Sequence, residues 1–175
     1  MNLKQLLSVV CLVFATSQWA YANTDEMRLH GQGTLRWLGL KIYDAQLFAP
    51  SQFSANTSFE RPFALELTYA RNFSGQSIAE RSLEEIKRLG IGSAEQHSRW
   101  LAQMQATFPN VSSGDRLRGV HQPGQGVSFY KNGQRIGNIQ DAEFSRAFFA
   151  IWLDPRTAEP SLRSRLLGLA ASDRP

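Results

Sequence analysis

The order of strand-like and helical patterns is the feature that most restricts the fold of this chain. Two runs rich in β-branched and aromatic residues, MRLHGQGTLRWL and LKIYDAQLFA, flank Gly39 and predict a long hairpin over residues 27–49. After a polar loop, the run FALELTYAR (63–71) alternates, and one of its faces carries Phe63, Leu65, Leu67 and Tyr69. This alternation predicts a third, half-buried strand.

Helix-capping signals follow the third strand. The sequence SIAE at Ser77 matches the S-x-x-E capping box, with Ser74 as the alternative start of the same helix. Ser93 and Gln96 form a second capping box, and the helix that it opens is stopped by Pro109. Two helices are therefore predicted directly after the three strands.

The second half of the chain repeats this order. Three short strand-like segments, DRLRGVHQP, GQGVSFYK and QRIGNI, are separated by a Pro-Gly turn at 123–124 and an Asn-Gly turn at 132–133, which predicts an antiparallel meander. Asp141 then caps the apolar segment DAEFSRAFFAIWLD, and Pro160 opens a last helix. The whole order predicts an α+β domain in which helices cover one face of an antiparallel sheet.

The first residues have the pattern of a secretory signal peptide, which we assign to 1–22. Lys4 precedes an apolar run much shorter than the ~20 residues needed to span a bilayer, so a transmembrane anchor is the weaker interpretation. The small-x-small sequence AYA at 20–22 matches a cleavage site. We expect cleavage before Asn23, export to the periplasm or beyond, no integral membrane segment afterwards, and one mature domain over 23–175.

Composition excludes several classes of function. Cys11 is the only cysteine and leaves with the signal peptide, so the mature domain has neither a disulfide nor a cysteine nucleophile. Removal of Lys4 lowers the formal charge from +4 to +3, and the cations are mixed with acids along the chain, which argues against a nucleic-acid interface. His30, His97 and His121 lack partners at metal-ligand spacing. We therefore predict no metal site and no cofactor.

Two glycine motifs superficially resemble phosphate-binding loops. They are GQG at 31–33 and PGQG at 123–126, and neither of them precedes a predicted helix. Turns and strand kinks explain these glycines better. The chain also lacks a G-x-S-x-G motif, which argues against acyl-enzyme hydrolysis.

Five phrases of the sequence, taken together, carry a resemblance to a known family. They are GQGTLRWLGLKIYDAQLFA, LELTYARNFSG, SGDRLRG, PGQGVSFYKNGQRIGNIQDAEFSRAFFAIWLD and LRSRLLG, and they extend over nearly the whole mature chain. These phrases are similar to the bacterial, secreted branch of the chalcone isomerase-like family. The resemblance implies an open-faced β-sandwich of the chalcone isomerase type, with helices on one face of a large antiparallel sheet and a hydrophobic cleft between the two layers.

This family contains true chalcone isomerases and non-catalytic relatives, some of which bind fatty acids through the carboxylate. Arg36 stands roughly where the isomerases have an arginine that holds the substrate's phenolate. Tyr43, at the end of the sequence KIY, replaces their catalytic threonine, and Ile78 stands where they have a tyrosine that positions a water molecule. Both replacements count against flavonoid chemistry.

Four residues are our candidate ligand-binding residues: Arg36, Tyr43, Tyr69 and Arg71. The resemblance implies Tyr43, Tyr69 and Arg71, because an arginine and a tyrosine hold the carboxylate in the lipid-binding relatives. Arg36 is a cation on an apolar strand and must either face solvent or meet an anion. Solvated strand charges explain the two arginines equally well, and a core aromatic with a wet hydroxyl explains Tyr69. The aromatic segment 144–152 predicts a helix packed in the interior, one side of which would form the wall of the cleft.

Three functions remain open, and we rank them. The first is a periplasmic protein that binds a small amphipathic carboxylate, such as a fatty acid, without transforming it. The second is an intramolecular isomerase in which Arg36 stabilises an oxyanion and Tyr43 acts as general acid. The third is an interaction module whose partner protein docks on the sheet. The retained arginine beside replaced catalytic positions favours the first.

Overall fold

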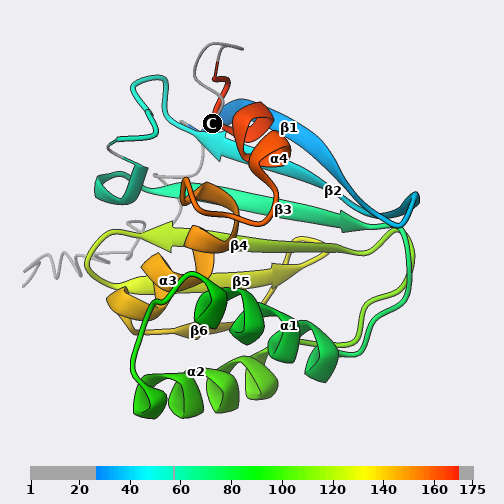
Figure 1. Ribbon diagram of the computed structural model, residues 1–175, viewed down its shortest axis with the longest axis vertical. Helices are drawn as coiled ribbons and strands as arrows, with labels where there is room; N and C mark the ends of the chain where they lie inside the picture. The colour runs from blue at the N-terminus through cyan, green and yellow to red at the C-terminus, as the bar shows by residue number, and fades with distance from the viewer. Residues whose placement is uncertain (1–26, 57, 170–175) are drawn as a thin grey trace, which may run out of the picture.

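The protein is built around one antiparallel sheet whose strands follow one another in sequence order. The computed structural model describes residues 27–56 and 58–169, so the predicted signal peptide and its cleavage position before Asn23 lie outside the described residues. Within this part, neighbouring strands pair in the order in which the chain makes them (Figure 1). The strands are β1 (Arg28–Trp37), β2 (Leu40–Ala49), β3 (Phe63–Tyr69), β4 (Arg116–Gln122), β5 (Gly126–Lys131) and β6 (Gln134–Ile139).

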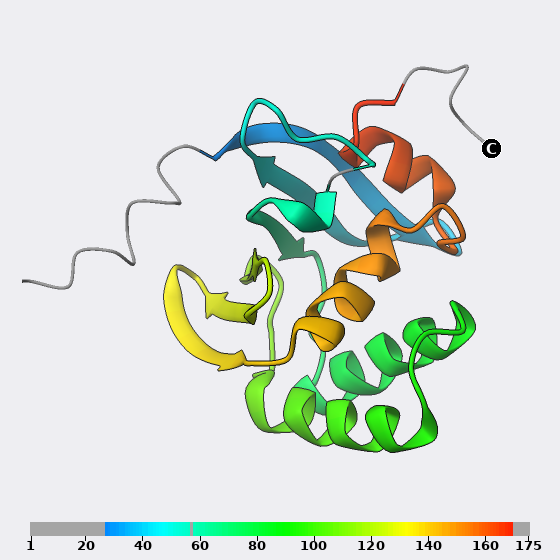
Figure 2. The same ribbon diagram turned by 90° about the vertical axis from the view of Figure 1, so that its left-hand side faces the viewer.

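Helices cover one face of this sheet, and none of the described helices lies on the other face (Figure 2). A short 3₁₀ turn, Ser58–Glu60, precedes β3, and the helices are α1 (Gly75–Arg88) and α2 (Ala94–Thr107) between β3 and β4, and α3 (Ala142–Leu153) and α4 (Pro160–Leu166) after β6. This arrangement confirms the predicted α+β fold. In the described part of the chain, no helix combines the length and the apolar character needed to cross a bilayer.

Side-chain caps fix where the helices begin. The hydroxyl oxygen of Ser74 accepts a hydrogen bond from the backbone N–H of Ser77 at 3.0 Å, so α1 starts from the alternative cap and the capping box predicted at Ser77 is wrong. The box formed by Ser93 and Gln96 is present at α2 as predicted. Asp141 caps α3 by accepting from the N–H of Phe144 at 2.9 Å. These bonds satisfy N–H groups that a helix start otherwise leaves unpaired.

Alternation along β2 and β3 decides which side chains enter the core. Tyr43 pairs with Tyr69, and Leu47 pairs with Leu65, so the apolar positions of both strands share the face that the helices cover. The third strand ends two residues earlier than predicted. The N–H of Ala70 still bonds the carbonyl oxygen of Ile42, which holds the segment after β3 close to β2.

The helix α3 runs through the interior and contributes several of the aromatic side chains of the core. Phe144 and Phe149 are completely buried, and the ring of Phe149 lies 4.8 Å from that of Phe63 on β3, measured between centroids. Phe148 meets Phe129 on β5 at 5.4 Å. A helix that is apolar on most sides needs cover on most sides. The structure therefore confirms the prediction of an interior helix over this segment.

The glycines of the GQG motif allow α4 to lie directly on β1. A methyl group placed on Gly31 would lie 2.2 Å from the carbonyl oxygen of Leu166, and one on Gly33 would lie 2.7 Å from a side-chain carbon of Leu162. No side chain fits at such distances. These glycines therefore serve close backbone approach, whereas turns or strand kinks were predicted for them. The PGQG motif forms a turn, in which Gly124 has the positive φ of 71°.

The turn of the first hairpin exposes large apolar side chains to solvent. Trp37 is 65% exposed, Leu38 80% and Leu40 47%, whereas the far halves of β1 and β2 pack under α4. The sequence pattern did not reveal this, because the tip has the same apolar composition as the buried part. The hairpin is therefore apolar both where it is covered and where it meets solvent.

His121 gives the fold a predicted dependence on pH. Its ring is 2% exposed on β4, with Nδ1 2.8 Å from the Ser145 hydroxyl and Nε2 3.1 Å from the carbonyl oxygen of Phe59. Because a carbonyl only accepts, Nε2 donates to Phe59 and Nδ1 accepts from Ser145, as a neutral imidazole does. Burial lowers the pKa of His121 below its ordinary value.

The unfolded chain therefore binds a proton more readily than the folded one once the pH falls below about 6.5. We expect the free energy of unfolding to fall as the pH drops from 7 toward 5, and to fall less steeply in His121→Gln, whose side chain does not titrate. Urea unfolding at several pH values measures both slopes. Equal slopes in the two proteins would show that protonation of His121 is not linked to folding.

Candidate functional site

Tyr43 and Tyr69 lie side by side between the sheet and the helices. They are register partners on β2 and β3, and their ring centroids are 6.0 Å apart in an edge-to-face arrangement. Tyr69 is 5% exposed, and Tyr43 is partly buried. The prediction had named both residues without showing that they touch, and strand pairing is what brings them together.

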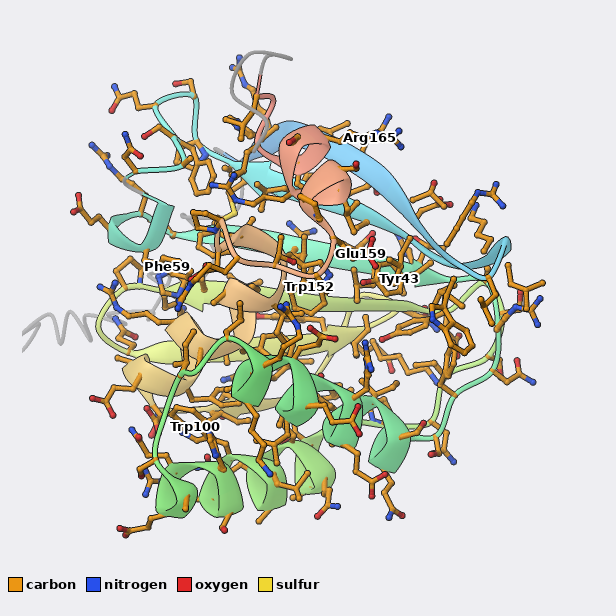
Figure 3. All side chains as sticks on the ribbon, viewed as in Figure 1. Tyr43, Phe59, Trp100, Trp152, Glu159 and Arg165 are labelled. Atoms are coloured by element: carbon orange, nitrogen blue, oxygen red, sulfur yellow. The ribbon has the colours of Figure 1, made fainter. Side chains whose placement is uncertain are left out.

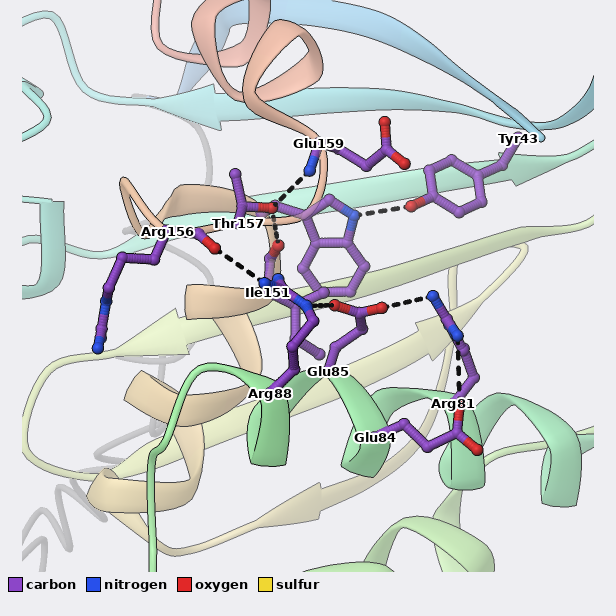
Figure 4. Close-up of polar contacts among 10 residues, drawn as sticks. Tyr43, Arg81, Glu84, Glu85, Arg88, Ile151, Arg156, Thr157 and Glu159 are labelled. Carbon is purple, nitrogen blue, oxygen red and sulfur yellow. Dashed lines mark hydrogen bonds and ion pairs between the residues drawn. The ribbon is translucent and has the colours of Figure 1, made fainter. Parts of the chain in front are cut away.

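Tyr43 is also tied to α3. The indole Nε1–H of Trp152 donates to the phenolic oxygen of Tyr43 at 2.9 Å, across 109 residues of sequence (Figure 4). In the side-chain view Tyr43, Trp152 and Glu159 converge between β2 and α1 (Figure 3). Since an indole N–H only donates, the tyrosine's own O–H remains free to donate to something else.

Neither phenol gives its proton to a protein acceptor in the part of the chain that the structure describes. The oxygen of Tyr43 makes its bond to Trp152 as an acceptor, and the hydroxyl of Tyr69 has no hydrogen-bond partner among the described residues. The oxygen of Tyr69 is not among the buried side-chain atoms that lack a partner, so it is open to solvent although the ring is buried. The pair therefore presents two adjacent O–H donors, between the sheet and the helices, that are available to an acceptor outside the described chain.

Burial keeps both phenols protonated. It raises the pKa of Tyr43 well above its ordinary value, an effect that the Trp152 hydrogen bond opposes and the negative charge of Glu159 reinforces. Burial raises the pKa of Tyr69 as well, with a further contribution from Tyr43. Both hydroxyls are neutral hydrogen-bond donors throughout the physiological pH range, and neither is set up to lose its proton.

A cluster of charged residues borders the tyrosine pair on the side of α1. Glu85 is 8% exposed and accepts from Arg81 at 2.5 Å and from Arg88 at 2.8 Å. Arg88 also donates to the backbone carbonyl of Arg156, which ties α1 to the segment between α3 and α4 (Figure 4). Burial and the nearby Glu85 raise the pKa of Glu159 above its ordinary value. Positive and negative charges thus alternate at this border.

The two predicted arginines lie away from the tyrosine hydroxyls. Arg36 is exposed at the end of β1, where its guanidinium donates to the carbonyl oxygen of Gly39 over a long 3.4 Å. Arg71 is exposed just beyond β3. Of the four predicted ligand-binding residues, the structure brings together the tyrosines, while the arginines share the same end of the sheet and face solvent.

Several neighbours of the pair were not among the predicted site residues. Trp152 belongs to the aromatic segment of which one side was expected to form the cleft wall, and Arg81, Glu85 and Glu159 had not been singled out. The spacing of Arg81, Glu85 and Arg88 on one predicted helix indicates ion pairs. It does not indicate that this side of the helix meets β2.

Two shallow hollows lie elsewhere on the surface. One of about 380 Å³ is lined by polar residues of β4, β5 and β6, including Gln122, Arg135 and Asn138. The other, of about 260 Å³, lies between α1 and α2 around Leu83 and His97. Neither hollow is lined by the tyrosines. Trp152 packs against Tyr43, and the ring of Phe73 lies 5.7 Å from that of Tyr69, measured between centroids.

A six-stranded antiparallel sheet with helices on one face and buried phenols between the layers defines the structural class of this protein. The chain belongs to the chalcone isomerase-like family, whose model matches residues 14–168. It is similar to a Haemophilus influenzae protein, with 30% identity over 173 residues that make up 99% of this chain and 81% of the relative.

A solved structure shows the same fold. The crystal structure of a fatty-acid binding protein from Arabidopsis thaliana superposes with a TM-score of 0.67 at 16% sequence identity, and the match covers 85% of this chain and 90% of that one. The predicted chalcone isomerase type of architecture is therefore confirmed.

Proposed function

We propose that this protein binds a small amphipathic molecule, such as a fatty acid, between its sheet and its helices and does not transform it. The observation that carries the proposal is the pair of buried phenols, Tyr43 and Tyr69, whose O–H groups have no acceptor in the described part of the chain. A carboxylate accepts two such bonds at once. The fatty-acid binding of the Arabidopsis neighbour supports the same class of ligand.

The surroundings of the pair suit a molecule with one polar end. Trp152 and Phe73 supply apolar surface beside the phenols, as ligand sites with a few convergent polar groups do. Arg81 is the cation whose charge acts on Tyr43, and it partly offsets Glu85 and Glu159. Entry of an acyl chain requires Trp152 to move from its present position, so binding would break its bond to Tyr43.

The isomerase alternative is less well supported. It needs Tyr43 to give up a proton, yet burial raises the pKa of this phenol, and proton transfer is efficient only when the pKa lies near the working pH. It also needs Arg36 beside the reacting oxygen, whereas this guanidinium is exposed and bonds Gly39. These groups favour recognition of a ligand over conversion of one.

Loss of one phenolic hydroxyl tests the proposal. Tyr69→Phe keeps the buried ring and removes only the donor, and a hydrogen bond to a charged group contributes about 1.5–3 kcal/mol. We expect the affinity for dodecanoate, measured by isothermal titration calorimetry, to fall roughly tenfold or more.

The matched control is Tyr130→Phe, because Tyr130 lies on β5 and, by its register with Arg118, points to the open face of the sheet. This variant is expected to bind as the unchanged protein does. Absence of dodecanoate binding by the unchanged protein, or equal affinities in all three proteins, would contradict the proposal. Turnover of a chalcone by the unchanged protein would favour the isomerase instead.

We further propose that the protein acts outside the cytoplasm after loss of residues 1–22. The support is the sequence alone: a short apolar run after Lys4 and a small-x-small site before Asn23. An exported carrier of amphipathic molecules would work next to a membrane that supplies them.

A further inference from the structure

The tip of the β1–β2 hairpin collects apolar side chains that the fold leaves in water. Leu29, Trp37, Leu38 and Leu40 are the exposed large hydrophobic residues of the described chain, and three of these four belong to this single turn. Single exposed apolar residues are ordinary, but a contiguous group usually marks an interaction site. The tip forms the right-hand edge of the molecule in Figure 1.

The backbone of the turn shows that folding does not require this composition. Leu38 and Gly39 have φ values of 49° and 78°, nearly the same as the 51° and 85° of Asn132 and Gly133 in the β5–β6 turn. Such turns favour Asn-Gly, because a left-handed backbone is unfavourable for a residue with a bulky side chain. The chain uses the favoured pair in one hairpin and places an 80% exposed leucine in the other.

Cations surround the apolar tip. Arg36 and Lys41 flank it as register partners, and Arg71 is exposed beside them because the N–H of Ala70 bonds the carbonyl oxygen of Ile42. Arg116 is the first residue of β4 and Lys131 is the last residue of β5. The strand pairing places both at the same end of the sheet as the tip.

Three acids at this end of the sheet are paired with cations. Asp44 pairs with Lys41, Asp115 pairs with Lys131, and Glu66 lies near Arg116. Neither Arg36 nor Arg71 forms an ion pair of this kind among the described residues, although the charge of Arg36 also acts on Asp44 and helps to lower its pKa.

We propose that this tip docks on an anionic phospholipid bilayer. Trp37 would sit at the level of the headgroups, Leu38 and Leu40 would enter the boundary with the acyl chains, and Arg36 and Arg71 would contact lipid phosphates. Tryptophan and leucine flanked by basic residues are the combination that binds this interface. The tip lies at the same end of the sheet as Tyr43 and Tyr69, but docking does not require that those residues bind a ligand.

The test measures how the protein, purified from the cells that make it, binds to two kinds of vesicle. One kind contains phosphatidylglycerol mixed with phosphatidylethanolamine, and the other contains phosphatidylcholine alone. We expect flotation with the anionic vesicles and a blue shift of tryptophan emission. Trp100 and Trp152 are 1% and 7% exposed, so among the described tryptophans Trp37 is the one that changes its surroundings. Trp37→Phe should abolish the shift.

Leu38→Asn separates docking from folding. It restores the Asn-Gly pair of the other hairpin, so its melting temperature should rise while its affinity for anionic vesicles falls about tenfold. Leu29→Asn, at the exposed leucine outside the tip, should bind as before. Arg36→Gln combined with Arg71→Gln should weaken binding to the anionic vesicles alone. Dodecanoate titration of Leu38→Asn should match the unchanged protein.

Three results would overturn the proposal. The first is failure of the unchanged protein to float with anionic vesicles. The second is equal binding by Leu38→Asn and the unchanged protein. The third is an unchanged protein that does not bind vesicles but self-associates in sedimentation, with Leu38→Asn abolishing the self-association. This result would make the tip a contact between copies of this chain.

Discussion

Phe149→Ala is expected to lower the free energy of unfolding by about 3–5 kcal/mol, the range for removing a large aromatic side chain from a core. Phe149 is fully buried on α3, and its ring meets those of Phe63, His121 and Phe148 at centroid distances of 4.8, 5.9 and 5.4 Å. A methyl group on Gly119 would lie 3.1 Å from the same ring, so the glycine on β4 leaves room for the ring of Phe149. Alanine would leave a cavity between α3 and the sheet. Urea unfolding measures the loss.

Phe48→Ala is the matched control. This ring lies on β2 but on the open face, where it is partly exposed and the Arg118 guanidinium covers it at 4.8 Å from the ring centre. Its removal should cost about 1 kcal/mol, because much less apolar surface returns to water. Equal losses in the two variants would show that the aromatic layer under α3 is not the main source of stability.

Gly31→Ala is the second change with a large expected effect. The added methyl group would lie 2.2 Å from the carbonyl oxygen of Leu166 and 2.3 Å from that of Arg165, so it meets backbone that no rotamer change can move. The whole of α4 must shift off β1. We expect a loss of about 3 kcal/mol or more, at the upper end for overpacking. Hydrogen exchange should show faster opening of α4 than of α3.

Gly137→Ala controls for the general effect of removing a strand glycine. The added methyl group on β6 would meet only the Thr107 side chain, at 3.1 Å, and this side chain can adjust. A change below about 1 kcal/mol is expected. A Gly31→Ala protein as stable as this control would mean that α4 is not held closely on β1.

Local patterns were sufficient to predict most of the fold. Alternation in FALELTYAR identified the face of β3 that enters the core, and the apolar positions of α3 indicated an interior helix. The start of α1 was missed because Ser74 and Ser77 are both suitable caps, and the serine that carries the cap is decided by how the chain leaves β3. Capping energies of this kind are too similar to separate two serines three residues apart.

The candidate site depended on contacts that local patterns cannot show. Tyr43 and Trp152 are 109 residues apart, and their hydrogen bond exists only because the C-terminal end of α3 reaches Tyr43 on β2. Arg36 could be read from the sequence either as a solvated charge or as a ligand-binding cation. Trp37 and Leu38 beside it are exposed, and Arg36 is exposed with them at the end of the hairpin.

Native mass spectrometry of the protein recovered from its own cells tests the binding proposal most directly, when bound molecules are then extracted and identified. The predicted result is a chain lacking residues 1–22 that carries one amphipathic acid, and the acid should be lost when Tyr43→Phe and Tyr69→Phe are combined. An empty protein that stays empty after incubation with excess dodecanoate would contradict the proposal that the two phenols hold a ligand's polar end.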